Sequence, residues 1–107
     1  MKNKFKKIDE LNKELQGICV GDLPKDDQFR ELFGLLAIIE PYIESRVRAF
    51  YKDNTLKIDK EFVSIYLKDL EHAVKHISYK KFAYFKDIKK RTLLSTKILK
   101  LMLEIGK

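Results

Sequence analysis

Residues 79–105, YKKFAYFKDIKKRTLLSTKILKLMLEI, repeat apolar and basic side chains at the three- and four-residue steps of an α-helix. On a helical wheel, five lysines of this segment share one arc of roughly 100°. These lysines are Lys86, Lys89, Lys90, Lys97 and Lys100. The opposite side collects the residues that we expect to face a core: Tyr84, Phe85, Ile88, Thr92, Ser95, Leu99, Met102 and Leu103. The sequence therefore predicts one long terminal helix, ended by Gly106, with a buried side and a cationic side.

The segments before residue 79 show the same helical spacing. A first helix is predicted over about residues 3–16, because its apolar residues recur every three or four positions. They are Phe5, Ile8, Leu11, Leu15 and Ile18. Gly17 and the run GDLP at residues 21–24 then turn the chain. Asp26 and Asp27 favour the start of a second helix that reaches about residue 40. Pro41 either kinks a helix that continues through Phe50 or begins a new one.

A further helix is predicted after residues 53–55, DNT, which interrupt the apolar pattern. Asp59 is a suitable N-cap for it. The apolar residues that we assign to this helix are Phe62, Ile65, Tyr66, Leu70, Ala73 and Ile77. No segment has the alternation typical of a buried strand. We therefore expect residues 1–107 to form a single all-α domain, a bundle of four to five helices with short loops and antiparallel neighbours.

Length and composition exclude several classes of protein. A chain of 107 residues with 45% apolar residues suits one globular domain. The lone Cys19 cannot form an internal disulfide, and the basic start lacks the apolar core of a secretory signal, so we expect a cytoplasmic protein. The longest uncharged stretch, residues 32–39, is far shorter than the roughly 20 residues that span a bilayer.

The net charge of +7 is concentrated in the terminal segment. Residues 1–78 contain 14 Lys+Arg and 14 Asp+Glu, whereas residues 79–107 contain 9 basic residues against Asp87 and Glu104. A row of lysines attracts phosphate backbones by releasing condensed counterions, without reading base sequence. The residues predicted to bind nucleic acid are Lys86, Lys89, Lys90, Lys97, Lys100, Lys80, Lys81 and Arg91. Tyr79, Phe82 and Tyr84 are interleaved with them and are suited to stacking on unpaired bases.

We therefore expect a non-catalytic binding module, acting alone or as a small subunit of a ribonucleoprotein complex. The basic residues near the N-terminus, Lys2, Lys4, Lys6 and Lys7, extend the positive surface if the first and last helices are neighbours. The alternative is a small cytosolic inhibitor or immunity-type protein that binds an acidic protein surface. Leucines around most of the terminal helix, Leu93 on the lysine side included, also favour a homo-oligomer or a stable complex over a membrane surface.

The sequence contains few residues arranged for metal binding or catalysis. Asp69, His72 and His76 share one helix edge, but two histidines and a carboxylate fall short of a four-ligand zinc site. The run HAVK at residues 72–75 resembles the motif of histidine phosphotransfer domains, in which a lysine follows the histidine by three residues on a four-helix bundle. That family has a glycine directly after the lysine, where this chain has His76. Phosphotransfer is thus a remote alternative, and we predict no enzyme activity, catalytic residue, metal or cofactor.

Overall fold

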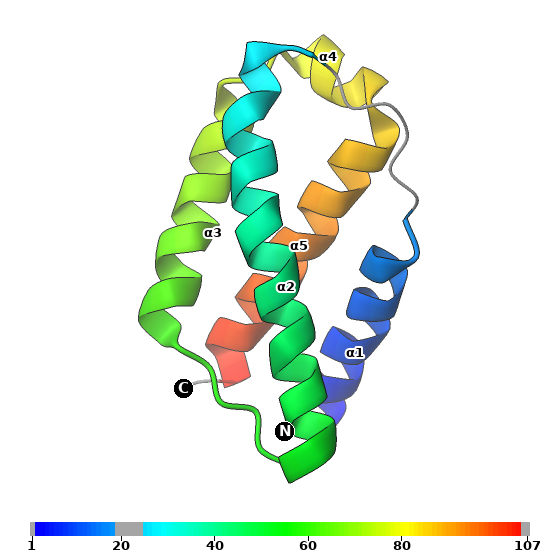
Figure 1. Ribbon diagram of the computed structural model, residues 1–107, viewed down its shortest axis with the longest axis vertical. Helices are drawn as coiled ribbons and strands as arrows, with labels where there is room; N and C mark the ends of the chain where they lie inside the picture. Colours follow the sequence, from blue (N-terminus) through cyan, green and yellow to red (C-terminus); the bar gives the residue numbers. More distant parts are fainter. Residues whose placement is uncertain (1, 19–24, 106–107) are drawn as a thin grey trace.

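The computed structural model describes residues 2–18 and 25–105 of the chain, with side chains from Lys4 onward (Figure 1). Its elements are α1 (Lys2–Gln16), the 3-10 turn η1 (Asp27–Phe29), α2 (Arg30–Asp53), α3 (Lys60–Lys75), α4 (Tyr79–Tyr84) and α5 (Lys86–Ile105). These residues contain helices and no strand, which confirms the predicted all-α bundle. Cys19, the turn at residues 21–24 and Gly106 lie outside the described residues.

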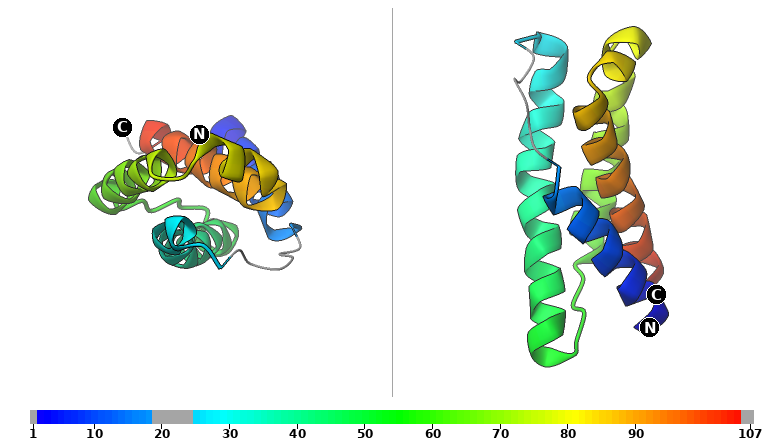
Figure 2. Two further views of the ribbon diagram at one scale, coloured as in Figure 1. Left: turned by 90° about the horizontal axis from the view of Figure 1, so that it is seen from above. Right: turned by 90° about the vertical axis from the view of Figure 1, so that its right-hand side faces the viewer.

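The long helices alternate in direction, and α5 lies at the centre of the arrangement. Helices α1 and α3 flank α5, and α2 packs across all three (Figure 2). The start of α1 and the end of α5 lie at the same end of the bundle, where Lys4 Nζ is 3.9 Å from Glu104 Oε2. The first and last helices are therefore neighbours, which the sequence left open.

The core forms along the apolar stripes of these helices. All of Phe5, Ile8, Leu11 and Leu15 on α1 are buried, as their spacing predicts. The matching stripe of α2 consists of Leu32, Leu36, Ile39, Ile43 and Val47. Stacking of the Phe5 ring on Phe50, with ring centroids 3.7 Å apart, joins the two stripes near the end of the bundle.

Helix α2 is continuous through Pro41, so the second helix extends beyond residue 40, where the sequence predicted its end. Pro41 lies on the exposed side of α2, where water can serve the carbonyl that its missing N–H leaves unpaired. The helix ends at Asn54, which adopts a left-handed conformation (φ 56°) and donates its N–H to the Phe50 carbonyl at 2.7 Å.

Helix α3 begins as predicted, since the Asp59 carboxylate accepts the N–H of Phe62 at 3.1 Å. The predicted core face is wrong at Ile65, which is 49% exposed, whereas Val63 is fully buried. The buried stripe runs through Val63, Leu70, Ala73 and Ile77. Ile65 lies on the opposite side of the helix from this stripe, because two residues from Val63 correspond to about 200° of rotation.

The terminal segment is two helices rather than the single predicted one. The backbone bends at Phe85 (φ −89°, ψ 76°), whose N–H closes α4 and whose carbonyl accepts the N–H of Lys89 at 3.0 Å. The bend lets the Phe85 ring meet Phe29 edge-on, with centroids 5.3 Å apart. Tyr84, which we expected in the core, is 78% exposed.

Candidate nucleic-acid interface

The exposed side of α5 is the side that the helical wheel assigns to lysines. Lys86, Lys90, Lys97 and Lys100 are exposed, and Leu93 among them is 48% exposed. The buried residues of α5 are Ile88, Thr92, Leu94, Ser95, Ile98, Leu99 and Met102. From Lys86 to Lys100 the helix rises about 21 Å. We call the residues Lys86, Lys89, Lys90, Lys97 and Lys100 the lysine strip.

Among the described residues, most of the lysine strip is free of ion pairs. Only Lys90 has a carboxylate within reach, with its Nζ 3.2 Å from Glu14 Oε1 on α1. In the described part of the chain, Lys86, Lys89, Lys97 and Lys100 form no salt bridge. Among the described residues of neighbouring helices, Glu14 is therefore the one that neutralises a charge of the strip.

A groove of about 420 Å³ opens beside the lysine strip, between α1, α4 and the first half of α5. Its lining combines apolar side chains with lysines: Leu11, Glu14, Ala83, Lys86, Lys89, Lys90, Leu93, Leu94 and Lys97. Glu14 is the one acidic residue of this lining. The groove thus offers an apolar surface bordered by four ammonium groups to any ligand that carries negative charge beside an apolar part.

The leucines of α5 are covered mainly within this chain. Helix α1 packs along one side of α5 and α3 along the other, so Leu94, Ile98 and Leu99 are all buried. The excess of leucines that suggested a second chain is thereby accounted for, apart from Leu93. The prediction of an oligomer loses this support.

Arg91 differs from its lysine neighbours because it is bound within the fold. Its Nε and Nη2 donate to the two carboxylate oxygens of Glu40 on α2, at 2.9 and 2.7 Å. Both side chains are largely enclosed, at 13% and 20% exposure, and the hydrogen bonds that Arg91 donates to Glu40 raise the pKa of Arg91. The guanidinium that we predicted to contact nucleic acid therefore joins α5 to α2.

The basic and aromatic residues of α4 also divide into some that are bound or buried within the fold and some that are exposed to solvent. Lys81 pairs with Asp26, and this bond, with the N–H of Gln28, holds the pKa of Asp26 below its ordinary value. Phe82 is buried, so it cannot stack on a base. Lys80 is exposed, and Tyr79 is 81% exposed, so Tyr79 and Tyr84 are the two aromatic rings that α4 presents to solvent.

The residues of α1 add to the same surface. Lys6 and Lys7 are exposed, and Lys4 reaches Glu104 at the end of α5. The side chain of Lys2 lies outside what the structure describes. Sequence reasoning missed Leu11 and Glu14 as site residues, because only the packing of α1 on α5 brings them beside Lys90.

The histidines lie together, with His72 Nε2 and His76 Nε2 3.0 Å apart on the exposed side of α3. Asp69, one turn before, is exposed and forms no salt bridge with a described residue. The described residues contain no group of three or more histidine, cysteine or acidic side chains arranged for a metal ion. In the hydrogen-bonded pair, the nitrogen of His72 that would accept a phosphoryl group is engaged by His76.

Within the described ranges, no helix is both long and apolar enough to cross a membrane. Comparisons of the chain with known protein families, with curated proteins and with solved structures found no match. Inference about function therefore starts from the geometry of the lysine strip and its groove.

Proposed function

We propose that the chain is a non-catalytic module that binds the phosphate backbone of nucleic acid through the lysine strip of α5. The observation that carries this proposal is the row of exposed lysines on one side of a single helix, most of which no described carboxylate neutralises. The module acts alone or as a small subunit of a ribonucleoprotein complex.

The dimensions of the strip suit a polyanion. One strand of a duplex places a phosphate about every 3.4 Å along its axis, so a strip of about 21 Å runs beside about six phosphates. Lysine contributes a mobile point charge rather than the planar fork that arginine uses to read guanine. We therefore expect binding that depends on charge and that is indifferent to base sequence.

The groove and the tyrosines of α4 favour single strands. Leu93, which is 48% exposed, offers an apolar surface beside the ammonium groups, and Tyr79 and Tyr84 are exposed at the adjoining end of α5. Unpaired bases can lie on such surfaces while their phosphates meet lysines, whereas stacked bases of a duplex cannot.

The test is fluorescence anisotropy with labelled single- and double-stranded oligonucleotides over a range of salt concentrations. If four lysines each neutralise one phosphate, the logarithm of the binding constant falls against the logarithm of salt with a slope of about −3 for single strands. Reversing the charge of Lys86, Lys97 and Lys100 together to glutamate should abolish measurable binding at low salt. The three side chains are exposed, so the variant should fold.

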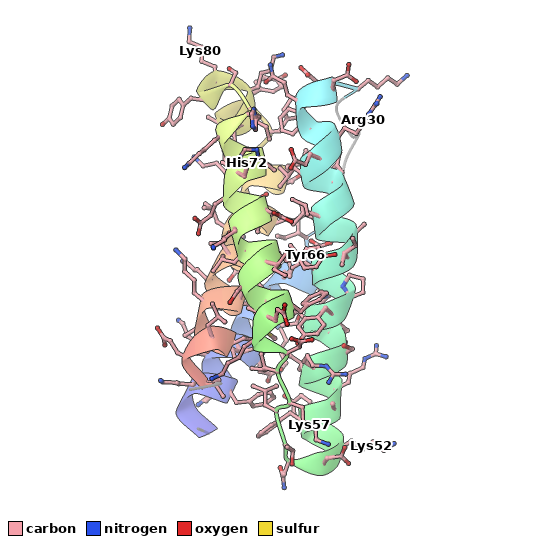
Figure 3. All side chains as sticks on the ribbon, turned by 90° about the vertical axis from the view of Figure 1, so that its left-hand side faces the viewer. Arg30, Lys52, Lys57, Tyr66, His72 and Lys80 are labelled. Carbon is pink, nitrogen blue, oxygen red and sulfur yellow. The ribbon has the colours of Figure 1, made fainter. Side chains whose placement is uncertain are left out.

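A second triple variant separates the lysine strip from net charge alone. Lys52 is exposed on α2, Lys57 on the loop after it and Lys68 on α3. Figure 3 shows Lys52 and Lys57 at the end of the bundle opposite to Lys80. Changing these three to glutamate alters the net charge by the same amount. Binding should persist in this control; equal losses in both variants would show that the strip is not the site.

An acidic protein partner is the second function that one observation favours. The same groove, with an apolar surface and a lysine border, suits an amphipathic helix with acidic residues along its edges. Pull-down from the native host with and without nuclease distinguishes the two functions. Recovery of one stoichiometric protein that resists nuclease favours the protein partner, and nuclease-sensitive recovery of many proteins favours nucleic acid.

A further inference from the structure

The last turn of α3 holds two histidines that neither the core nor the lysine strip uses. His72 and His76 are four residues apart and both exposed, and Figure 3 shows His72 toward the end of α3 that is remote from Lys57. The backbone at His76 is held in helical geometry, since its N–H bonds the carbonyls of Ala73 and Val74. Both imidazoles therefore project from one fixed edge of the helix.

The two rings present the same nitrogen to one another. Their Nε2 atoms are 3.0 Å apart, with ring centroids 4.5 Å apart and planes at 73°. Without a metal, one Nε2 must carry the proton that the other accepts. Two neutral imidazoles with both Nε2 atoms unprotonated would instead point two lone pairs at a common position.

We propose that His72 and His76 form a binding site for a late divalent transition-metal ion, in which the ion takes the place of the shared proton. Imidazole is a preferred ligand for copper, nickel and zinc. Binding requires both rings to be neutral with the proton on Nδ1, so the ring that donated through Nε2 moves its proton to Nδ1 by exchange with solvent, and no proton is released overall. Because the described residues offer no third ligand here, water fills the remaining coordination positions.

The two imidazoles indicate which ions the site binds most strongly. The 3.0 Å between the Nε2 atoms is the hydrogen-bond separation of the metal-free pair, and bonds of about 2.05 Å to one ion are compatible with it at an angle of about 94°. For nitrogen ligands, the affinity of divalent ions rises through Ni²⁺ to Cu²⁺ and falls at Zn²⁺. The site therefore suits Cu²⁺ best.

The experiment is calorimetric titration of the full chain, free of any histidine tag, with Ni²⁺. One ion should bind per chain. Either His72→Ala or His76→Ala should weaken binding at least about tenfold, because each leaves a single imidazole. In a Cys19→Ser background, which removes a competing thiol, the electron paramagnetic resonance spectrum of bound Cu²⁺ should show coupling to two imidazole nitrogens.

Two matched variants test the spacing rather than the number of histidines. Lys68→His combined with His76→Ala places the second histidine one turn before His72, again at a four-residue spacing. This variant should recover Ni²⁺ binding. Glu71→His combined with His76→Ala also keeps two histidines, but neighbouring residues point about 100° apart and cannot share an ion. Lys68 and Glu71 are both exposed, so both variants should fold.

Binding that survives in His72→Ala and in His76→Ala would overturn the proposal, as would equal affinity in the Glu71→His and Lys68→His double variants. Circular dichroism of each variant confirms that α3 is retained, so a loss of binding is attributable to the lost ligand. Oligonucleotide binding should be unchanged in all of them, since the site uses no residue of the lysine strip.

Discussion

Lys90 and Arg91 are adjacent in the sequence and carry the same charge, yet the fold gives them opposite surroundings. Lys90 is exposed and has one carboxylate neighbour at the edge of an open groove. Arg91 is enclosed and donates from Nε and Nη2 to the Glu40 carboxylate. The same contrast extends to other residues. Each arginine of the sequence contacts a partner within the chain: Arg30 with Asp27, Arg46 with the Tyr42 ring, Arg48 with Glu44 and Arg91 with Glu40.

The chemistry of the two side chains accounts for the difference. The guanidinium of arginine is planar, weakly hydrated and matched to a carboxylate by two parallel hydrogen bonds, so it tolerates enclosure between helices. The ammonium of lysine is strongly hydrated and stays in water while its methylene stem covers apolar surface. On α5, the charge that is available to a ligand is therefore that of the lysines and not that of Arg91.

The largest expected effect on stability comes from removing the enclosed arginine. Arg91→Ala leaves the Glu40 carboxylate, which is 20% exposed, without its two charged donors. We expect the free energy of unfolding to fall by about 2–3 kcal/mol, measured by urea denaturation followed by circular dichroism. Oligonucleotide affinity should change little once the protein is folded.

Arg30→Ala is the control for this variant. Arg30 pairs with Asp27, but the two side chains are 85% and 91% exposed, so we expect a loss below about 0.5 kcal/mol. If Arg91→Ala lowered oligonucleotide affinity as much as the change of a strip lysine, the distinction between enclosed arginine and free lysine would be wrong.

Much of this contrast follows from periodicity, and part of it does not. The wheel of residues 86–105 predicted which side of α5 is exposed, because a 3.6-residue repeat of apolar residues admits one buried face. The sequence grouped Arg91 with the nucleic-acid-binding residues and did not identify Glu40, since a pair 51 residues apart depends on how two helices pack. The bend at Phe85 had no local signal either, because no glycine or proline marks it.

The lysines of the candidate site were predicted from the sequence, whereas the groove beside them was not. All five lysines of the strip lie on one helix, so the sequence alone grouped them. The groove also requires Leu11 and Glu14 of α1 and Ala83 of α4, which tertiary packing brings beside α5. On α3, Ile65 was misassigned because an apolar side chain at an approximate helical step does not reveal which neighbouring helix it faces.

A smaller effect is expected where α1, which forms one wall of the groove, is fastened to α2. Buried Asn12 donates to the Glu44 carboxylate at 2.8 Å, and this hydrogen bond, with Arg48, holds the pKa of Glu44 below its ordinary value of 4.5. Because the folded pKa is lowered, the ionised group stabilises the fold above about pH 5, and this stabilisation is lost as pH falls through the folded pKa.

Glu44→Gln isolates this contribution, since the amide oxygen still accepts from Asn12 but carries no charge. The variant should be less stable than the natural chain by about 0.5–1 kcal/mol at neutral pH, and the difference should shrink as the pH falls through the folded pKa of Glu44. Urea denaturation at a series of pH values measures it. Glu71→Gln, at an exposed position that forms no salt bridge with a described residue, should show a much flatter difference; identical profiles would contradict the role of the Asn12 contact.

The smallest effect concerns Lys90, which lies between the two extremes. Glu14→Gln removes the one acidic side chain of the groove lining. It also breaks the ion pair with Lys90, whose side chain is 55% exposed and that of Glu14 48% exposed. An exposed pair of this kind stabilises by about 0.2–1 kcal/mol, so oligonucleotide affinity at low salt should rise about twofold to fivefold. The salt slope should steepen by nearly one, because a further lysine becomes available to phosphate.

Glu10→Gln provides the matched charge control for that variant. Glu10 is exposed one turn before Glu14 on α1 but does not line the groove, so its neutralisation changes the net charge equally without freeing Lys90. Its affinity should rise less, and its salt slope should remain that of the natural chain. Equal slopes in the two variants would show that phosphates do not reach Lys90, and would confine the binding surface to the other lysines of the strip.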